Sequence, residues 1–351
     1  MIQKLLLFLF IPFSLFSDWM DKTVEREFAR WEETGITQEM IDYTWQSCKL
    51  KHKYYFKRYR IVNSRIYGPD TTIKALLKEI GKKYPLPDVD FIYYHWDNLP
   101  SRFLDKWKLG QTAPILISSK HKDESREIVF IDNFYEAARM EGWNALIKGI
   151  NRHHNRVPWE EKIEKLIWRG GDTDGRYTQE KWNPKKPFHR GTLVRMGSIS
   201  HPELIDAAFV EPRCDDRKHF EWFQETFHTD TFLSPVRHME YKYQMIIDGV
   251  TCTWPGTQWR LLSGCLSFKQ ETDDLLWFFE PLTPWQHYIP VKRDLSDLVE
   301  KILWAKEHDD EARQIAENGR EFALNNLMKE DILLYCYKIL CKYAELQEKG
   351  K

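Results

Sequence analysis

The chain has 351 residues, of which 42% are hydrophobic and 15% aromatic, enough to bury the core of one large or two medium-sized domains. Lysine and arginine together number 52 and aspartate and glutamate 53, so the formal net charge is −1. This balance argues against a general nucleic-acid binder, which would carry a basic surplus. No nucleic-acid partner is therefore expected.

The N-terminus has the order of residues that is typical of a secretory signal peptide. Lys4 precedes an apolar stretch over residues 5–16, and Ser17 and Asp18 follow it. The stretch is short for a bilayer span, and no other segment reads as one. We therefore predict a signal peptide over residues 1–17 and no stable membrane span. The alternative is an apolar N-terminal element that docks on the first domain.

Short strands and helices alternate along the first half of the chain. Residues 19–54 are predicted to be helical, with a helix start at 36–39, and a hairpin follows at 60–68 with Asn63 and Ser64 at its turn. The pattern then predicts a helix at 71–85, strands at 89–96, 113–120 and 127–132, and a helix at 135–150.

The same alternation returns after a polar stretch at 151–158. It predicts strands at 165–170, 204–210, 241–249 and 265–270, with helices at 190–197 and 257–264. Three helices close the chain, at 294–308, 309–327 and 329–347, and Asp294 or Ser296 is expected to cap the first of them.

This alternation predicts an α/β protein with mostly parallel sheets. Its two blocks predict two Rossmann-like domains that face each other across a cleft, an N-terminal domain over residues 18–155 and a second over 156–329. A C-terminal helical segment, 330–351, is expected to pack back on the first domain. Ligands of such sheets bind beyond the carboxyl ends of the strands.

Two groups of residues lie at those strand ends. Asp97 follows a strand that ends in bulky aromatic side chains, which would desolvate its carboxylate and raise its pKa towards that of a general base. From the local sequence alone, an Asx turn or helix cap explains Asp97 better. Arg169, Gly170 and Gly171 end another strand, where a fixed charge beside bare backbone favours a phosphate. An ordinary strand-end turn explains this second group equally well.

The sequence contains no convincing motif for a metal site or for a catalytic nucleophile. His153 and His154 are adjacent and cannot share one helical face, and Asp172 and Asp174 fit a polar loop better than a divalent-ion site. No Walker loop, GxGxxG fingerprint or GxSxG elbow is present. We therefore predict no metal site and no cofactor.

Several strings resemble those of the family 90 glycosyltransferases, the Rumi-type protein O-glucosyltransferases and their capsule-associated relatives. They are "IWRGGD", "HPELIDAAF", "YKYQMIIDG", "LTPWQHYIPVKRDLSDLVEKILWAKEHDDEA" and "IAENGREFALNNLMKEDI", and the resemblance runs from about residue 60 to residue 346. It implies a GT-B fold, a UDP-sugar donor, and inverting transfer without a metal.

The resemblance also implies roles for individual residues. The family's catalytic aspartate follows an "LPD" run, which here leads to Asp97 and makes it the expected general base. Its diphosphate-binding arginine best matches Arg190, with Arg176 as the rival. The residues expected at the nucleotide sugar are Arg169, Gly170, Gly171, Arg190, Val250, Thr251, Cys252, Thr253, Trp254, Gly256, Thr257 and Arg260. Those expected on the acceptor side, in the first domain, are His95, Trp96, Asp132, Asn133 and Phe134.

The chain departs from the family at one point that bears on activity. Eukaryotic members carry an arginine near the position of Trp254, which this chain lacks, and Arg260 is expected to replace it. The leading hypothesis is transfer of glucose or xylose from UDP to a hydroxyl of an EGF-like repeat or of a lipopolysaccharide or capsule glycan. The alternative is a catalytically inactive carbohydrate- or protein-binding module on the same scaffold.

The signal peptide implies export to a bacterial envelope or medium, or to the lumen of the secretory pathway. The last residues, Glu348, Lys349, Gly350 and Lys351, are not an endoplasmic-reticulum retention signal.

Overall fold

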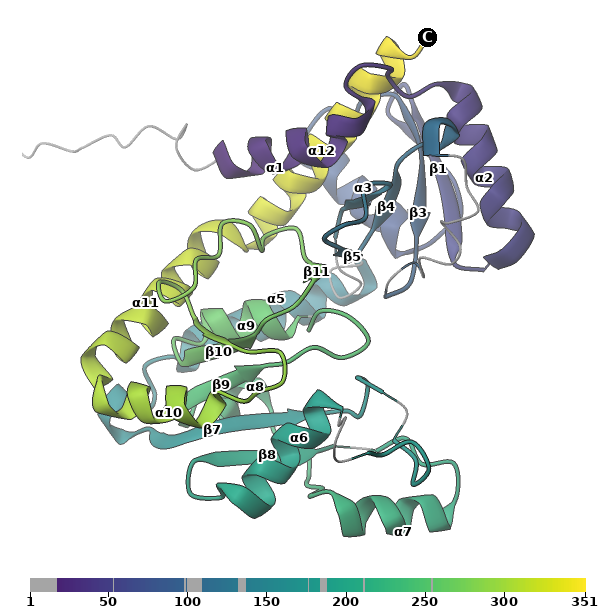
Figure 1. The fold of residues 1–351 in the computed structure, drawn as a ribbon. Helices are drawn as coiled ribbons and strands as arrows, with labels where there is room; N and C mark the ends of the chain where they lie inside the picture. Colours follow the sequence, from purple (N-terminus) through teal and green to yellow (C-terminus); the bar gives the residue numbers. More distant parts are fainter. Residues whose placement is uncertain are drawn as a thin grey trace, which may run out of the picture.

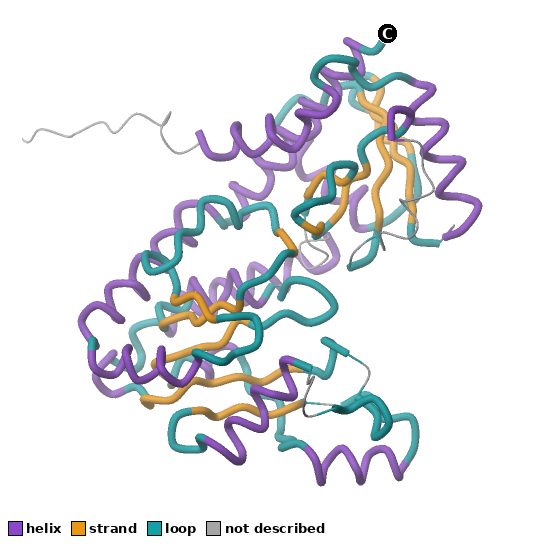
Figure 2. Tube along the Cα trace, viewed as in Figure 1, coloured by secondary structure: helices purple, strands orange, loops and turns teal. Residues whose placement is uncertain are grey.

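The structure is a computed structural model that describes residues 18–52, 54–97, 99, 109–131, 137–175, 177–183, 188–210, 212–253 and 255–351. The predicted signal peptide lies outside these residues. Two five-stranded sheets occupy two halves of the molecule, with helices packed on them (Figures 1 and 2). The predicted α/β class with parallel sheets is confirmed. Within the described ranges, no helix has the length and apolar character needed to cross a membrane.

The first sheet has the strand order β2-β1-β3-β4-β6. Its strands are β1 (Phe56–Val62), β2 (Arg65–Tyr67), β3 (Val89–Tyr94), β4 (Ile115–Ile117) and β6 (Glu127–Val129). The predicted hairpin is present, because β1 and β2 are antiparallel and Asn63 and Ser64 between them have φ values of 49° and 62°. Strand β3 is buried along its whole length and runs parallel to β4, which runs parallel to β6.

The helices of this half follow the apolar spacing of the sequence. They are α1 (Asp18–Phe28), η2 (Ala29–Trp31), α2 (Gln38–His52), α3 (Thr72–Lys83), η3 (Leu109–Gln111) and α5 (Ala137–His153). Thr37 accepts a hydrogen bond from the amide of Met40 at the start of α2, which is the predicted helix start. In α3, the buried side chains are Ile73, Leu76, Leu77 and Ile80, which form one helical face.

The second sheet is wholly parallel and has the order β12-β10-β9-β7-β8. Its strands are β7 (Ile163–Gly170), β8 (Ile205–Phe209), β9 (Tyr241–Ile246), β10 (Leu266–Gln270) and β12 (Ile289–Val291). Its helices are η4 (Trp159–Glu161), α6 (His189–Arg195), the π-helical η5 (Met196–Ser200), α7 (Arg217–Thr226), α8 (Pro235–His238), α9 (Gly256–Leu262), α10 (Leu298–Glu307) and α11 (Asp309–Asn326).

The two halves are joined by more than the linker at 151–158. Strand β5 (Lys120–His121) of the first half pairs with β11 (Asp274–Leu275) of the second, and Lys122 Nζ lies 2.9 Å from Asp273 Oδ1 beside them. Helix α5 contacts α3 in one half and α8 and α9 in the other. One apolar cluster therefore contains Trp143 of α5 together with Trp259 of α9.

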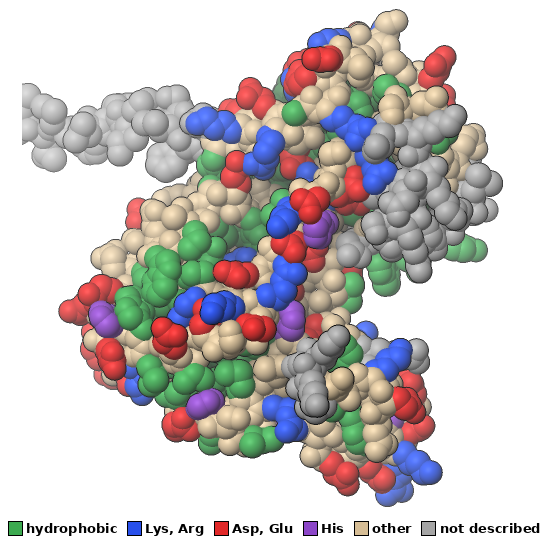
Figure 3. Space-filling model, viewed as in Figure 1, with side chains coloured by type: hydrophobic (Ala, Val, Ile, Leu, Met, Phe, Trp, Pro, Cys, Tyr) green, Lys and Arg blue, Asp and Glu red, His purple; other side chains and the backbone are tan. Residues whose placement is uncertain are grey.

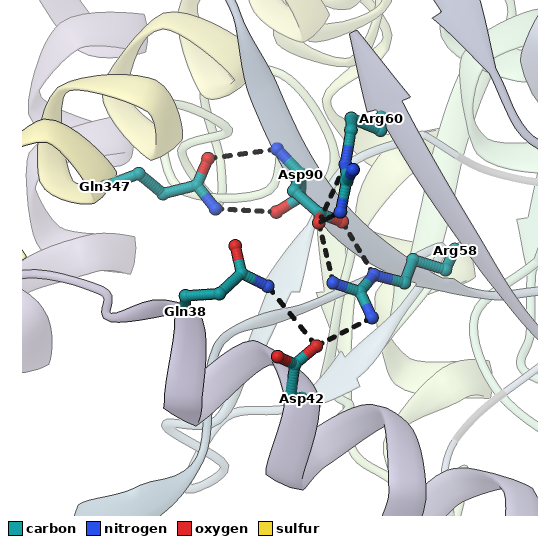
Figure 4. A network of polar contacts seen from close by, with 6 residues as sticks. All are labelled: Gln38, Asp42, Arg58, Arg60, Asp90 and Gln347. Atoms are coloured by element: carbon teal, nitrogen blue, oxygen red, sulfur yellow. Dashed lines mark hydrogen bonds and ion pairs between the residues drawn. The ribbon is translucent and has the colours of Figure 1, made fainter. Parts of the chain in front are cut away.

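Helix α12 (Lys329–Lys349) continues the path of α11 and lies against the first sheet (Figure 1). Tyr335 donates a hydrogen bond to the carbonyl of Val129 at 2.8 Å, and Tyr343 donates one to the carbonyl of Pro114 at 3.0 Å. Gln347 bonds both the amide and the carbonyl of Asp90 (Figure 4). These contacts fix the end of the chain to β3 and its neighbours.

The Asp90 carboxylate organises the polar network on the outer face of β1 and β3 (Figure 4). It accepts hydrogen bonds from Arg58 and Arg60, and Arg58 also bonds Asp42 of α2. The arginine charges here are compensated by carboxylates within the protein.

The predicted cap of the first closing helix was wrong. Helix α10 begins at Leu298 and has no side-chain cap. The Asp294 carboxylate instead accepts a hydrogen bond from the amide of Ser296, and this bond closes the turn before the helix.

Candidate active site

Arg190 holds the carboxyl ends of β7 and β9 together. Its Nη1 donates to the carbonyl of Gly171 at 2.8 Å and to Thr173 Oγ1 at 2.6 Å, and its Nε donates to the carbonyl of Asp248 at 2.9 Å. The guanidinium lies over the Trp168 ring, 5.5 Å from its centroid. Only 8% of Arg190 is exposed, and burial lowers its pKa. Arg190, which was expected at the diphosphate, thus lies at the strand ends, but its donors already bond the protein itself.

Arg260 differs from Arg190 in its partners. Only 4% of it is exposed, its Nη1 donates to the carbonyl of Gly256 at 3.1 Å, and its guanidinium lies 4.2 Å from the centroid of the Trp259 ring. Its buried Nε has no hydrogen-bond partner, and no carboxylate among the described residues forms an ion pair with it. Burial, together with the charge of Arg190, lowers the pKa of Arg260 to about 9. The guanidinium is still charged at pH 7 and lacks an anion.

Arg169 is neutralised within the protein. Its Nη2 lies 2.8 Å from Asp206 Oδ1 and 2.8 Å from Asp230 Oδ2, and only 7% of its side chain is exposed. The arginine of the strand-end motif therefore joins β7 to β8 and the segment after it. A Cβ on Gly170 would lie 2.5 Å from the Trp168 ring, so this glycine makes room for a ring of its own strand.

The loop after β9 packs against Arg190. A Cβ on Gly249 would lie 2.9 Å from Arg190 Nη2 and 2.3 Å from Thr173 Oγ1, so only glycine fits there. Of the expected loop residues, Val250 is 52% exposed, and Thr251 and Cys252 are buried. Thr253 donates a hydrogen bond to the carbonyl of Ile247 at 2.5 Å. Trp254 lies outside the described residues.

The first turn of α9 is closely packed. A Cβ on Gly256 would lie 2.2 Å from Thr253 Cγ2 and 2.6 Å from Arg260 Nη1. Thr257, one of the residues expected at the nucleotide sugar, is fully buried, and its amide donates to the carbonyl of Thr253 at 3.2 Å. The glycine thus lets Arg260 lie against the loop, while the Thr257 amide is occupied.

Asp97 lies just beyond the carboxyl end of β3, half-buried, and burial raises its pKa. Among the described residues its carboxylate has no hydrogen-bond partner. The Asx turn or helix cap considered from the sequence involves Asn98, which lies outside the described residues. Its neighbour Trp96 is 51% exposed and lies 5.1 Å, centroid to centroid, from the Tyr55 ring. His95 is half-buried, and its amide donates to the carbonyl of Tyr55 at 2.8 Å.

The remaining acceptor-side residues, Asp132, Asn133 and Phe134, lie outside the described residues, as does Arg176.

A cavity of about 220 Å³ that sequence reasoning missed lies beside Gly249. It is lined by the carboxyl ends of β9 and β10 and by His121 of the first half, with Asp248, Gln270 and Arg293 in its wall. Figure 3 shows acidic, basic and histidine side chains gathered where the two halves meet. The strand-end rule that drew attention to Asp97 and Arg169 would have found Asp248 and Gln270 as well, since both follow or end predicted strands.

Gln270 orders this cavity. Its Nε2 donates to His189 Nδ1 at 2.7 Å and to the carbonyl of Arg293 at 2.6 Å, and its Oε1 accepts from the amide of Asp248 at 3.2 Å. Asp274 also lines the cavity, and burial beside the charge of Asp248 raises its pKa to about 6. Within the described parts of the chain, no three His, Cys, Asp or Glu side chains are placed to hold a metal ion.

Comparison with known proteins gives a consistent result. Protein O-glucosyltransferase 2 of Danio rerio is 31% identical over 306 residues, which cover 82% of this chain and 55% of that protein. Protein O-glucosyltransferase 1 of Rattus norvegicus is 30% identical over 312 residues, which cover 82% of this chain and 71% of that protein. The chain spans about half the length of the O-glucosyltransferases 2 and 3 that it matches.

Among solved structures, Anabaena Alr3699/HepE in complex with UDP-glucose aligns with a TM-score of 0.39 and 9% identity, over 68% of this chain and 64% of that one. A glycosyltransferase from Rickettsia africae ESF-5 aligns with a TM-score of 0.38 and 12% identity, over 71% and 70% of the two chains. The family model of glycosyl transferase family 90 matches residues 19–350. Since this match covers nearly the whole sequence, the chain belongs to glycosyl transferase family 90.

Proposed function

We propose that this member of family 90 transfers glucose or xylose from a UDP-sugar to a hydroxyl group of a protein or glycan. The observation that carries the proposal is the charged, buried guanidinium of Arg260, which has no carboxylate partner among the described residues and lies near a second buried arginine. An uncompensated cation inside a protein is costly, and a bound diphosphate would supply the missing anion. The names of the relatives, protein O-glucosyltransferases, support the reaction class.

On the donor side, Arg260 would bind the diphosphate directly, and Arg190 would position the loops around it. Arg190 bonds both Gly171 and Asp248, so it sets the distance between the carboxyl ends of β7 and β9. As the bond from the anomeric carbon to the diphosphate oxygen breaks, its electron pair passes to the leaving UDP. Fixed positive charge in a buried site stabilises that developing negative charge without having to reorganise. Permanently charged arginines can serve this role in place of a metal ion.

On the acceptor side, Asp97 would act as general base. Its raised pKa and lack of a described hydrogen-bond partner suit a carboxylate that receives a proton. The acceptor oxygen would attack the anomeric carbon from the face opposite UDP as its proton moves to Asp97. One such displacement inverts the configuration at that carbon. Trp96, beside Asp97 and half-exposed, offers an aromatic surface to the acceptor.

A donor panel tests the proposal. Purified protein is incubated with UDP-glucose, UDP-xylose, UDP-galactose or UDP-N-acetylglucosamine, with and without EDTA, together with a folded EGF-like repeat or a lipopolysaccharide or capsule glycan. We expect UDP release with glucose or xylose donors that EDTA leaves unchanged. Binding of an acceptor or of UDP without any UDP release would contradict transfer and favour the inactive binding module. Loss of turnover with EDTA would contradict metal independence.

The site of action is part of the proposal. We propose that the chain is exported by the segment 1–17 and meets its acceptor outside the cytosol. Sequencing the N-terminus of the exported protein tests this, because it should begin at or near Asp18.

A further inference from the structure

A second cavity, of about 330 Å³, lies at the amino ends of strands of the second sheet, opposite the carboxyl ends where Arg190 lies. It is bordered by Lys162, just before β7, and by Gly264, just before β10. The linker from α5 to β7 and helix α11 form its other walls. Its volume is at the small end of the range for small-molecule sites.

Four basic side chains line this cavity: Arg313, which is paired with carboxylates, and Lys162, Arg320 and His154, which are not paired with any among the described residues. Lys162 is 7% exposed, and its Nζ donates to the carbonyl of Met239 and lies 3.6 Å from Cys265 Sγ. Arg320 donates from Nη1 to the carbonyl of Leu262 and from Nη2 to Asn151 Oδ1 at 2.9 Å. Both cations thus have only neutral partners.

His154 is the last of these basic groups. A Cβ on Gly264 would lie 3.3 Å from Arg320 Cδ and 3.8 Å from His154 Cδ2, so the two side chains flank this glycine. Burial, with the charges of Arg320 and Lys162, lowers the pKa of His154. The imidazole is therefore neutral at pH 7 and can donate one N–H without adding charge.

The carboxylates of the cavity are already paired. Glu160 and Glu317 both bind Arg313, at 2.7 and 3.0 Å. Within the described chain, no carboxylate lies within ion-pair distance of Lys162 or Arg320. Their bonds to Met239 and Leu262 place them near the ends of α8 and α9, where helix dipoles attract cations. That attraction amounts to about half a charge per helix, so it leaves much of the two positive charges uncompensated.

We propose that this cavity is a second anion site, which binds the phosphate group of a small molecule at a distance from the UDP-sugar site. A phosphate has oxygens enough to accept hydrogen bonds from Lys162, Arg320 and His154 together, and arginine and lysine are the side chains that proteins use for it. The bound phosphate would connect the linker between the two halves to α11 and to the start of β7. Its occupancy would therefore stiffen the region that joins the two sheets.

Calorimetric titration with inorganic pyrophosphate tests the proposal. The full chain is titrated at constant ionic strength with excess UDP present, so that the donor site is filled. We expect saturable binding to the wild type, weakened at least about tenfold in Arg320→Gln and in Lys162→Met, because each change removes a charge-assisted hydrogen bond. Arg217→Gln is the matched control, since the Arg217 side chain is 91% exposed and distant in sequence from this cavity. Its affinity should equal that of the wild type.

Two further measurements keep the result independent of the proposed function and of folding. In Arg260→Gln without UDP, pyrophosphate should still bind, because that variant lacks only the donor-site arginine. Circular dichroism confirms that each variant is folded, and Arg320→Lys, which keeps the charge, should recover part of the affinity. Absence of saturable binding in the wild type, or equal affinity in folded Arg320→Gln and Lys162→Met, would overturn the proposal.

Discussion

Replacing Arg260 by methionine should stabilise the protein and weaken donor binding in the same molecule. Burial, together with the charge of Arg190, lowers the pKa of Arg260 from the usual range of a guanidinium to about 9. At about 1.36 kcal/mol per pH unit, so large a lowering of the pKa makes the buried charge unfavourable by several kcal/mol. Because the folded pKa is the lower one, this penalty is fully present below pH 9 and is relieved only as the pH rises above 9.

The methionine variant recovers only part of that free energy. It also loses the hydrogen bond to the Gly256 carbonyl and the contact between the guanidinium and the Trp259 ring. Replacing buried charges by apolar side chains of similar volume commonly gains about 1–4 kcal/mol. We therefore expect Arg260→Met to raise the free energy of unfolding at pH 7 by about 1–3 kcal/mol, measured by urea denaturation without ligand.

Donor binding should change in the opposite direction. Loss of a hydrogen bond from a charged group costs about 1.5–3 kcal/mol, so UDP affinity should fall roughly 10- to 100-fold. UDP should raise the melting temperature of the wild type and, at the same concentration, leave that of the variant nearly unchanged. Arg217→Met, at a side chain that is 91% exposed, is the control and should alter neither quantity. A variant that is destabilised and still binds UDP normally would refute the reasoning, because Arg260 would then be structural.

Three other changes test neighbouring parts of the site. Asp97→Asn should lower turnover about 10²- to 10⁴-fold and leave UDP affinity unchanged. Because burial raises the pKa of Asp97, activity of the wild type should be lost on acidification at a pH above the usual pKa of a surface aspartate. Gly256→Ala places a Cβ 2.2 Å from Thr253 Cγ2, so it should destabilise the protein by about 1–3 kcal/mol and weaken UDP binding, as measured by denaturation and calorimetry. Asp274, with its pKa raised to about 6, binds a proton more tightly in the folded protein than in the unfolded one. The free energy of unfolding of the wild type should therefore fall relative to that of Asp274→Asn as the pH rises from about 4 to about 6. The same difference in stability between the two proteins at pH 4.5 and at pH 7.5 would contradict this.

Elements with strong periodicity or a clear turn signal were predicted well from the sequence. The hairpin with Asn63 and Ser64, helix α3 and the parallel strands around β7 all lie where the pattern indicated. Helix α7 was missed, although Asp216 accepts a hydrogen bond from the amide of His219 at its start. Its buried face contributes only Phe223, which leaves a weak apolar pattern to detect.

The pairing of β5 with β11 was beyond sequence reasoning for a different reason. Each strand has two residues, and they are separated by more than 150 positions in the chain. The pairing depends on the docking of the two halves and on the contact of Lys122 with Asp273. Local propensity contains no information about such a long-range contact.

The sequence predicted three arginines at the site but not the groups that each of them binds. Arg169, Arg190 and Arg260 were all expected at the nucleotide sugar, and all three are buried in the second half of the molecule. What separates them is the group that each already binds: two carboxylates for Arg169, backbone carbonyls and a hydroxyl for Arg190, and a single carbonyl for Arg260.

The partners of Arg169 and Arg190 come from β8, from the segment after it and from the loops after β7 and β9, so no local pattern reveals them. The partner of Arg260 is the first residue of its own helix, α9. The number of unsatisfied donors, more than the presence of the charge, determines which arginine is available to a ligand. Arg169 and Arg260 each have a buried Nε without a partner, but two carboxylates neutralise Arg169, whereas Arg260 has none among the described residues. Arg169 therefore maintains the sheet, Arg190 sets the spacing of the strand ends, and Arg260 keeps free donor capacity. An anion that enters the site would therefore gain most from Arg260, the arginine that the sequence predicts as the replacement for the one missing near Trp254.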